Sequence, residues 1–235
     1  QQNREELRRE FTANVSHELK TPLTSISGYA EIMKSGLVQA ADMGRFSEKI
    51  YMEAQRLITL VEDILNLSHL DEGAPGQERR QGIDLYALCE RAVASLAEAA
   101  RQRGIAISLT GSRQRVDGAE KLLAEIIFNL CDNAIKYNQE NGHVAVSVTR
   151  EGDRVVLTVQ DTGIGIPPGE TDRVFERFYR VDKSHSKEIG GTGLGLSIVK
   201  HAAAYHDAKI QLDSQLGRGT RVRVLFPLSQ REAQP

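Results

Sequence analysis

Tryptophan is absent from this sequence, and aromatic residues make up only 5% of it. A surface that stacks the bases of single-stranded nucleic acid is therefore not expected. The formal net charge is only -2, which gives no reason to expect nucleic acid or an anionic membrane as a partner. No apolar run approaches the roughly 20 residues of a membrane-spanning helix, and no signal peptide opens the chain. The remaining composition, 40% hydrophobic and 26% charged, is ordinary for a soluble globular protein.

Cysteine is scarce as well. Cys89 and Cys131 are far apart in the sequence and lie in apolar, helical contexts. We expect both to be buried free thiols, which fits a reducing, cytosolic compartment. The first residues, QQNREELRREF, read as helix without a capping residue, so we expect the chain to be a fragment of a longer protein.

Two long amphipathic helices are predicted in the first third of the chain. Apolar residues recur every three or four positions from Leu7 to Leu37, and again from Phe46 to Leu67. Gly36 to Gly44 forms the predicted turn between them, so the two helices make a hairpin. Two helices alone bury little surface, so we expect this hairpin to pair with a second copy into a four-helix bundle.

A polar segment rich in glycine, DEGAPGQERRQG, separates the hairpin from a second domain. We place the linker at residues 73–82. Helices are predicted at Asp84–Arg103, Glu120–Tyr137 and Leu194–Tyr205, with Asp84 as a helix cap. Strands are predicted at Ile105–Leu109, Arg113–Val116, Val144–Thr149, Val155–Gln160, Ile210–Asp213 and Thr220–Phe226. Because helices alternate with antiparallel hairpins, the predicted fold class is α+β.

The segment NLCDNAIKY, residues 129–137, places Asn129 and Asn133 one turn apart on one face of a helix. A buried asparagine is costly unless it is paired. A hydrogen-bonded core asparagine is one interpretation. The other is a pair of neutral oxygen ligands for a hard cation such as Mg²⁺. Lys136 and Tyr137, one turn later, are then candidates for contact with phosphate or ribose.

The segment QDTGIGIPP, residues 160–168, ends a predicted strand at Asp161 and turns through Gly163 and Gly165. A carboxylate at this position can accept a hydrogen bond from an exocyclic amine such as that of adenine. The glycines allow backbone to approach a flat ring closely. A turn of this kind is weak evidence when taken alone.

The segment GGTGLGLSIVKH, residues 190–201, is a glycine-rich turn that leads into a helix, where free amides and the helix dipole favour phosphate. It is not a Walker P-loop, because Leu196 rather than lysine follows Gly195. It is not a dinucleotide fingerprint either, because no strand precedes it. The basic, aromatic stretch FERFYRVDKSHSK before it is a candidate lid over a nucleotide, and it contains His185.

In order and spacing, these segments resemble the ATP-binding domain shared by gyrase, heat-shock-90, MutL and histidine kinases. The resemblance implies an α/β sandwich that binds ATP and Mg²⁺, with Asn133 and Asn129 at the metal and Asp161 at adenine. The cofactor-binding positions that it implies are Asn129, Asn133, Lys136, Tyr137, Asp161, Gly163, Gly165, Ile166, Arg177, Tyr179, Arg180, Gly191, Thr192, Gly193, Leu194 and Gly195. Gyrase-like members hydrolyse ATP with a glutamate where this chain has Asn129. Because a neutral amide cannot act as a general base for water, we expect ATP to serve another acceptor.

His17 is the candidate acceptor. On a helical wheel it points away from the apolar stripe, which is centred near Leu19 and Ile26. Glu18 beside it can hold the proton of one ring nitrogen and leave the other as a nucleophile. Thr21 lies one turn further along the same surface. Pro22 removes a helix hydrogen bond, so we expect a bend there.

Phe11–Ile26 resembles the H box of the dimerisation domain of sensor histidine kinases, with His17-Glu18-Leu19-Lys20-Thr21-Pro22 as its signature. The resemblance implies that His17 takes the γ-phosphoryl group of ATP and passes it to an aspartate of a response-regulator receiver domain. It implies Glu18 as the general base and Thr21 as the residue that positions water for dephosphorylating the regulator. The parent protein is then expected to be membrane-anchored, with this fragment on the cytoplasmic side.

The expected organisation is the end of a signalling helix at residues 1–10, a homodimeric phosphotransfer domain at 11–72, the linker, an ATP-binding domain at 83–229 and a tail at 230–235. Two other functions stay open on sequence alone. One is a gyrase-like ATPase, which Asn129 and the H box disfavour. The other is a pseudokinase that serves as a dimeric scaffold, which the complete set of motifs disfavours.

Overall fold

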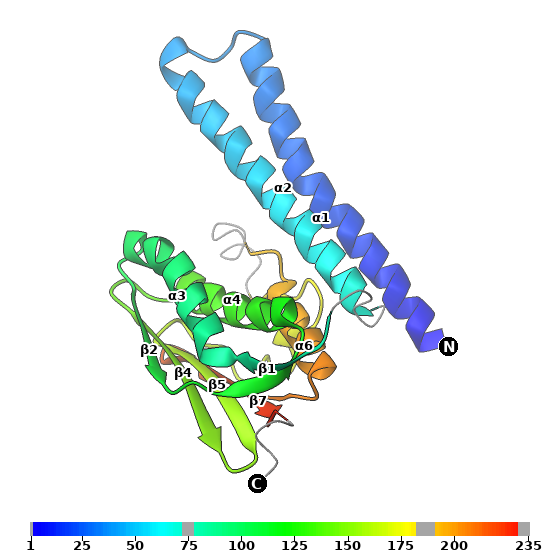
Figure 1. Ribbon diagram of the computed structural model, residues 1–235. Coiled ribbons are helices and arrows are strands. Elements are labelled where there is room, and N and C mark those ends of the chain that lie inside the picture. Colours follow the sequence, from blue (N-terminus) through cyan, green and yellow to red (C-terminus); the bar gives the residue numbers. More distant parts are fainter. Residues whose placement is uncertain (1, 72–77, 182–190, 230–235) are drawn as a thin grey trace. The chain divides into compact units, whose positions relative to one another are not determined.

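The computed structural model describes residues 2–71, 78–181 and 191–229 (Figure 1). The chain forms two compact units, residues 1–66 and 67–235. The predicted tail, the first part of the predicted linker, the part of the predicted lid that contains His185, and Gly190 lie outside the described residues. Among the described helices, none combines the length and apolarity needed to cross a membrane.

The first unit is the predicted helical hairpin. Helix α1 spans Gln2–Lys34, a short 3-10 helix, η1, spans Ala40–Asp42, and α2 spans Met43–Asp71 (Figure 1). At the end of the hairpin near the turn, the rings of Tyr29 and Phe46 meet edge to face with centroids 5.8 Å apart. Pro22 is buried, and α1 continues through it as one helix.

The second unit is an α/β sandwich, as the resemblance of its motifs implies. Its main sheet has five strands in the order β2-β4-β5-β7-β6, and β1 and β3 form a separate pair. The strands are β1 Arg80–Asp84, β2 Ala106–Gly111, β3 Arg115–Gly118, β4 His143–Glu151, β5 Arg154–Asp161, β6 Lys209–Gln215 and β7 Gly219–Pro227. Helices α3 Leu85–Gln102, α4 Glu120–Lys136 and α6 Gly195–Tyr205 pack on the sheet.

Alternation along the strands explains which face of the sheet carries the core. On β4, Val144, Val146 and Val148 are buried, and the residues between them are more exposed. Each helix supplies a buried stripe to the same core, such as Ile126, Ile127 and Leu130 on α4. Helix α3 begins where predicted, because the Asp84 carboxylate accepts a hydrogen bond from the Ala87 amide at 3.0 Å.

Three local features differ from the sequence-based expectations. Strand β1 begins at Arg80, within the predicted linker. It is stabilised by pairing with β3 and by a hydrogen bond of 2.8 Å from the Gly82 amide to Asp117. Strand β3 starts at Arg115 rather than Arg113. Strands β2 and β4 pair in parallel, whereas the sequence suggested only antiparallel hairpins. Parallel pairing needs a crossover connection, and α4 lies within the segment that joins these strands.

Candidate functional site

His17 lies on the exposed side of α1, as the helical wheel predicts, with 79% of its side chain accessible. Glu18 is mostly covered, and its Oε1 lies 3.9 Å from His17 Nδ1. The Thr21 hydroxyl donates a hydrogen bond of 3.2 Å to the His17 backbone carbonyl. The imidazole is therefore accessible, with a carboxylate beside one of its two ring nitrogens.

The two asparagines of the second unit lie on α4, facing the start of α6. Asn129 donates its Nδ2 hydrogen to the Glu125 carbonyl at 2.9 Å, so its oxygen is the atom that points away from its own helix. A Cβ atom added at Gly195 would lie 2.8 Å from Asn129 Oδ1 and 3.7 Å from Asn133 Nδ2. Only a residue without a side chain lets the N-terminus of α6 approach the asparagines so closely. Its free amides then lie beside two amide side chains.

The C-terminal end of α4 contacts the first glycine-rich turn. The Tyr137 carbonyl accepts a hydrogen bond of 3.0 Å from the Ile164 amide, and a Cβ atom at Gly163 would lie 2.3 Å from the same oxygen. Lys136 forms an ion pair of 2.6 Å with Asp132 along the helix. The two predicted motifs, far apart in sequence, are therefore adjacent in the fold.

Asp161 ends β5 and is partly buried. Its Oδ1 accepts hydrogen bonds from the Gly163 amide at 2.8 Å and from the Thr220 amide at 3.2 Å. Burial raises the pKa of this carboxyl group, and the two backbone hydrogen bonds oppose the rise. The turn that follows Asp161 is anchored to β6, because the Ile166 amide donates a hydrogen bond of 2.9 Å to the Ser214 hydroxyl. The carboxylate is thus fixed through one oxygen, and Oδ2 is the oxygen left for a ligand.

The phenylalanine-rich segment contacts the second glycine-rich turn through backbone. The Phe178 amide donates to the Gly193 carbonyl at 2.9 Å. Phe178 has a positive φ of 62°, which is unusual for a bulky residue. Gly193 has φ 74°, and a Cβ atom there would lie 2.9 Å from the Phe178 carbonyl carbon. Thr192 is buried, and its hydroxyl accepts from the Leu194 amide at 3.2 Å, next to the start of α6.

The structure assigns Arg177 and Tyr179 partners that the sequence did not reveal. Arg177 forms an ion pair of 2.6 Å with Asp71, and its guanidinium also lies 3.2 Å from His201 Nε2. Tyr179 packs under the Arg173 guanidinium, whose centre is 4.2 Å from the ring centroid. To contact a phosphate, Arg177 would have to leave Asp71.

Two residues at this site were not identified from the sequence. Thr220 binds Asp161 through its backbone amide, and Ser214 binds the turn at Ile166. The only hint was the glycine pair Gly217 and Gly219, which marks the hairpin that carries both residues. A Cβ atom at Gly219 would lie 2.0 Å from the Asp161 carbonyl oxygen, so this close approach requires glycine.

Other candidate chemistry is absent from the described residues. No group of three or more histidine, cysteine, aspartate or glutamate residues there could hold a metal ion. Both cysteines are buried and free, as predicted. Burial raises the pKa of the Cys131 thiol to about 12 and also raises that of Cys89, so neither is a reactive thiolate near neutral pH.

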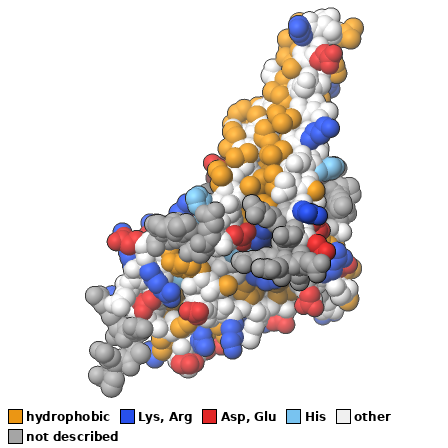
Figure 2. Space-filling view, turned by 90° about the vertical axis from the view of Figure 1, so that its right-hand side faces the viewer, with side chains coloured by type: hydrophobic (Ala, Val, Ile, Leu, Met, Phe, Trp, Pro, Cys, Tyr) orange, Lys and Arg blue, Asp and Glu red, His pale blue; other side chains and the backbone are white. Residues whose placement is uncertain are grey.

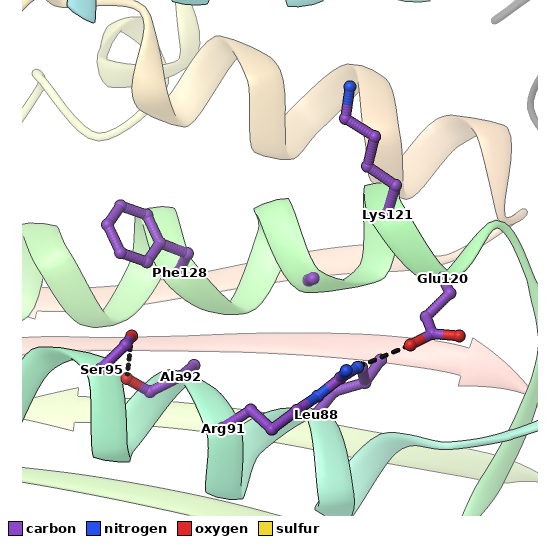
Figure 3. A pocket seen from close by; sticks show the side chains of 8 residues that line it. Leu88, Arg91, Ala92, Ser95, Glu120, Lys121 and Phe128 are labelled. Atoms are coloured by element: carbon purple, nitrogen blue, oxygen red, sulfur yellow. Dashed lines mark hydrogen bonds and ion pairs between the residues drawn. The ribbon is translucent and has the colours of Figure 1, made fainter.

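An open hollow of about 550 Å³ lies between α3 and α4 (Figure 3). Leu88, Ala92 and Phe128 give it an apolar lining, and the Arg91–Glu120 ion pair of 2.6 Å borders it. It contains none of the predicted site residues. The nucleotide motifs therefore converge elsewhere, around the N-terminus of α6 and the ends of α4 and β5.

Two families match most of the chain. Residues 118–230 match the family described as histidine kinase-, DNA gyrase B-, and HSP90-like ATPase. Residues 7–73 match the His Kinase A (phospho-acceptor) domain. The fold and the site thus define an ATP-binding domain preceded by a phospho-acceptor helical hairpin.

Relatives are similar in sequence over nearly the whole chain. The sensor-like histidine kinase SenX3 of Mycolicibacterium smegmatis is 40% identical over 224 residues, which is 95% of this chain and 58% of that protein. The sensor histidine kinase WalK of Bacillus subtilis is 35% identical over 99% of this chain and 38% of its own length. The chain belongs to the histidine kinases, which confirms the resemblance seen in its motifs. It spans about half the length of the curated relatives it matches.

Solved structures support the fold. The histidine kinase AdeS of Acinetobacter baumannii has a TM-score of 0.74 at 22% identity and covers 90% of this chain and 98% of that chain. The histidine kinase ThkA, solved in complex with the response regulator protein TrrA, has a TM-score of 0.75 at 23% identity. That similarity covers 98% of this chain and 65% of the ThkA chain.

Proposed function

We propose that this chain is the catalytic core of a two-component sensor kinase. It transfers the γ-phosphoryl group of ATP to His17 and then to an aspartate of a response-regulator receiver domain. One observation carries this proposal: an exposed imidazole with a carboxylate at one nitrogen occurs in the same chain as a complete set of nucleotide motifs. The proposed division is a phosphotransfer domain at residues 11–72 and an ATP-binding domain at 83–229, joined by the linker.

The position of Glu18 indicates which nitrogen of His17 reacts. Glu18 lies on the Nδ1 side, so it favours the neutral tautomer with hydrogen on Nδ1 and the lone pair on Nε2. Nε2 attacks the γ-phosphorus, the bond from that phosphorus to the bridging oxygen breaks, and ADP leaves with that electron pair. The Nδ1 proton then passes to Glu18. Most of the catalytic effect in such a reaction comes from positioning and charge stabilisation.

In the second unit, Asp161 Oδ2 accepts a hydrogen bond from the exocyclic amine of adenine. Gly163, Gly165 and Ile166 border the base. The turn from residue 191 to 195 and the first amides of α6 hold the phosphates, supported by the helix dipole. The remaining proposed ribose and phosphate contacts are Lys136, Tyr137, Tyr179 and Arg180, and Arg177 when it is released from Asp71.

The asparagine pair fits Mg²⁺ that is bound mainly through the nucleotide. Magnesium in such sites takes one or two protein oxygens, phosphate oxygens and water. Asn129 directs its oxygen away from α4, and Asn133 lies one turn further along, near the N-terminus of α6. We propose that both face the metal, with Asn133 as the direct ligand. The ion would neutralise the charge of the phosphates.

We further propose a phosphatase activity toward the phosphorylated regulator. Thr21 lies one turn after His17, and its hydroxyl is within reach of the same surface. Rotation away from the His17 carbonyl would allow this hydroxyl to orient a water molecule toward a phosphoaspartate. The regulator is the expected partner, since the related ThkA is described in complex with its response regulator protein.

The hairpin is proposed to act as a homodimer. Hydrophobic side chains gather along one face of the hairpin (Figure 2). On α2, Tyr51, Ile58 and Leu65 are spaced by seven residues. They are 58%, 50% and 54% accessible to solvent, respectively. Such a repeat packs against a second helix of the same kind.

We also propose that the full-length protein is a membrane-anchored sensor whose kinase core faces the cytoplasm, because the relatives are longer and named as sensor kinases.

Incubation with ATP labelled at the γ-phosphate tests the central proposal. The wild-type chain should acquire acid-labile label, and His17→Gln should acquire none, because glutamine lacks the nucleophilic ring. His69→Gln is a matched control, since His69 is also an exposed histidine of the hairpin, and it should label like the wild type. Equal labelling of His17→Gln and the wild type would disprove His17 as the acceptor.

A further inference from the structure

The helix-covered face of the sheet changes from apolar to polar at one end. Paired positions on three neighbouring strands form the last apolar row: Val159, Val222 and Leu212. Two positions nearer that end of the sheet, on the same face, the three strands carry Asp161, Thr220 and Ser214. Ser214 pairs with Thr220 across β6 and β7, and the Thr220 amide donates to Asp161. The core therefore ends in a row of oxygen-bearing side chains.

The three contacts of the Ser214 hydroxyl determine which group donates in each hydrogen bond of this row. The Ser214 hydroxyl oxygen lies 2.9 Å from the Ile166 amide, 3.0 Å from the Gly219 carbonyl and 2.8 Å from the Thr220 hydroxyl. The carbonyl can only accept, so it takes the single hydrogen of Ser214. The amide can only donate. Thr220 must then donate its own hydrogen to Ser214, which leaves the Thr220 hydroxyl oxygen with lone pairs alone.

Beside Asp161, two side chains of the described residues therefore present acceptors. Asp161 has one oxygen bound by two backbone amides, and its other oxygen is available. Thr220 adds a second acceptor next to it. An amine on a purine has two hydrogens to donate to such a pair, directly or through water. A carbonyl at the same purine position would meet lone pairs, which is unfavourable.

We infer that Ser214 is a positioning residue that makes this site select a purine with an exocyclic amine over one with a carbonyl. It does so by fixing the Thr220 hydroxyl as an acceptor and by holding the turn at Ile166. Ser214 itself does not touch the base. This inference rests on the proposed binding of adenine at Asp161.

Calorimetric titration of the whole chain with ADP and with inosine diphosphate, in magnesium chloride, compares the two purines. Inosine diphosphate carries a carbonyl in place of the amine and a hydrogen on the adjacent ring nitrogen, and both diphosphates avoid turnover. Ser214→Ala should lower the preference for ADP over inosine diphosphate about fivefold, because the freed Thr220 hydroxyl can rotate and donate to the carbonyl. Ser214→Thr keeps the hydroxyl and should keep the preference. Ser147→Ala makes the same chemical change on the other face of the sheet and should have no effect.

Three results separate the possible failures. If Asp161→Asn leaves the preference unchanged, the proposed contact of Asp161 with adenine is wrong. If Asp161→Asn removes the preference but Ser214→Ala retains it, the inference about Ser214 is wrong. Equal weakening of both nucleotides by Ser214→Ala would also overturn it, as a purely structural effect. If Ser214→Ala does not fold, Thr220→Val replaces it, and a retained preference in that variant overturns the inference.

Discussion

At the scale of single residues, His206 shows how a histidine can be structural rather than catalytic. Its ring is buried, Nδ1 donates to the Ala202 carbonyl at 2.7 Å, and Nε2 accepts from the Ala119 amide at 3.1 Å. Ala119 precedes α4 and supplies no side-chain cap of its own. The neutral ring therefore connects the end of α6 to the beginning of the helix that carries Asn129 and Asn133.

This arrangement predicts that the protein loses stability in mild acid. Burial lowers the pKa of His206 below its ordinary 6.5, and the Arg79 charge adds to the effect, while the hydrogen bonds and Asp207 oppose it. The unfolded chain then binds a proton more readily than the folded one. The stabilisation that the neutral His206 ring provides is complete above pH 6.5. It declines as the pH falls from 6.5 toward the lower pKa of His206 in the folded state.

Urea unfolding at about pH 7.5 and about pH 5.5 measures this effect. The free energy of unfolding of the wild type should fall between these conditions, and the fall should be smaller in His206→Gln. His69→Gln, which alters an exposed histidine, should behave like the wild type. A fall of the same size in His206→Gln would contradict the prediction.

At the scale of structural elements, the two glycine-rich turns are built by close approaches of backbone to backbone. Gly193 has φ 74° and faces the Phe178 backbone, whereas Gly152 has a similar φ of 60° in the β4–β5 turn with open space around it. Substitution by alanine adds left-handed strain of about 1–2 kcal/mol at either position. Only at residue 193 does the new methyl group also meet the Phe178 backbone.

We therefore expect Gly193→Ala to reduce ADP affinity more than about tenfold, because the turn before α6 must move. Gly152→Ala should lose about 1–2 kcal/mol of stability and keep its ADP affinity. Calorimetry with ADP and urea unfolding of both variants provide the comparison. Equal ADP affinity in the two variants would show that the contact with Phe178 does not shape the site.

Elements with a local signal were predictable, and those made by distant contacts were not. Helices α1, α2 and α4 follow from apolar spacing, and α3 begins at the predicted Asp84 cap. Strand β1 has a polar sequence, RQGID, and exists because β3 pairs with it. Local pattern carries no information about such a partner.

The same distinction applies to the candidate site. The motifs give Asp161, Asn129 and Asn133 by residue type and order alone. Ser214 and Thr220 lie at the site only because β6 and β7 pair with β5 in one particular register. That register cannot be predicted from the sequence pattern. The Arg177–Asp71 ion pair likewise joins residues 106 positions apart. Side chains that act through a distant partner therefore required the structure.

At the scale of the whole molecule, the apolar residues that the hairpin leaves accessible argue for a second copy. Ile58 lies at the centre of the repeat formed with Tyr51 and Leu65. In a symmetric dimer the accessible half of both copies of Ile58 would be buried, which stabilises association by about 1.5–3 kcal/mol. An aspartate at this position loses that burial and adds two charges to the interface.

Ile58→Asp should therefore weaken the dimer more than about 100-fold. Light scattering after gel filtration should give twice the 26.0 kDa chain mass for the wild type and the single-chain mass for Ile58→Asp. Thr59→Asp adds the same charge at the next, exposed position and should stay dimeric. Since residues 67–235 form their own compact unit, Ile58→Asp should bind ADP as the wild type does. A dimeric Ile58→Asp would exclude this stripe as the interface, whereas lost ADP binding would show that nucleotide affinity depends on the bundle.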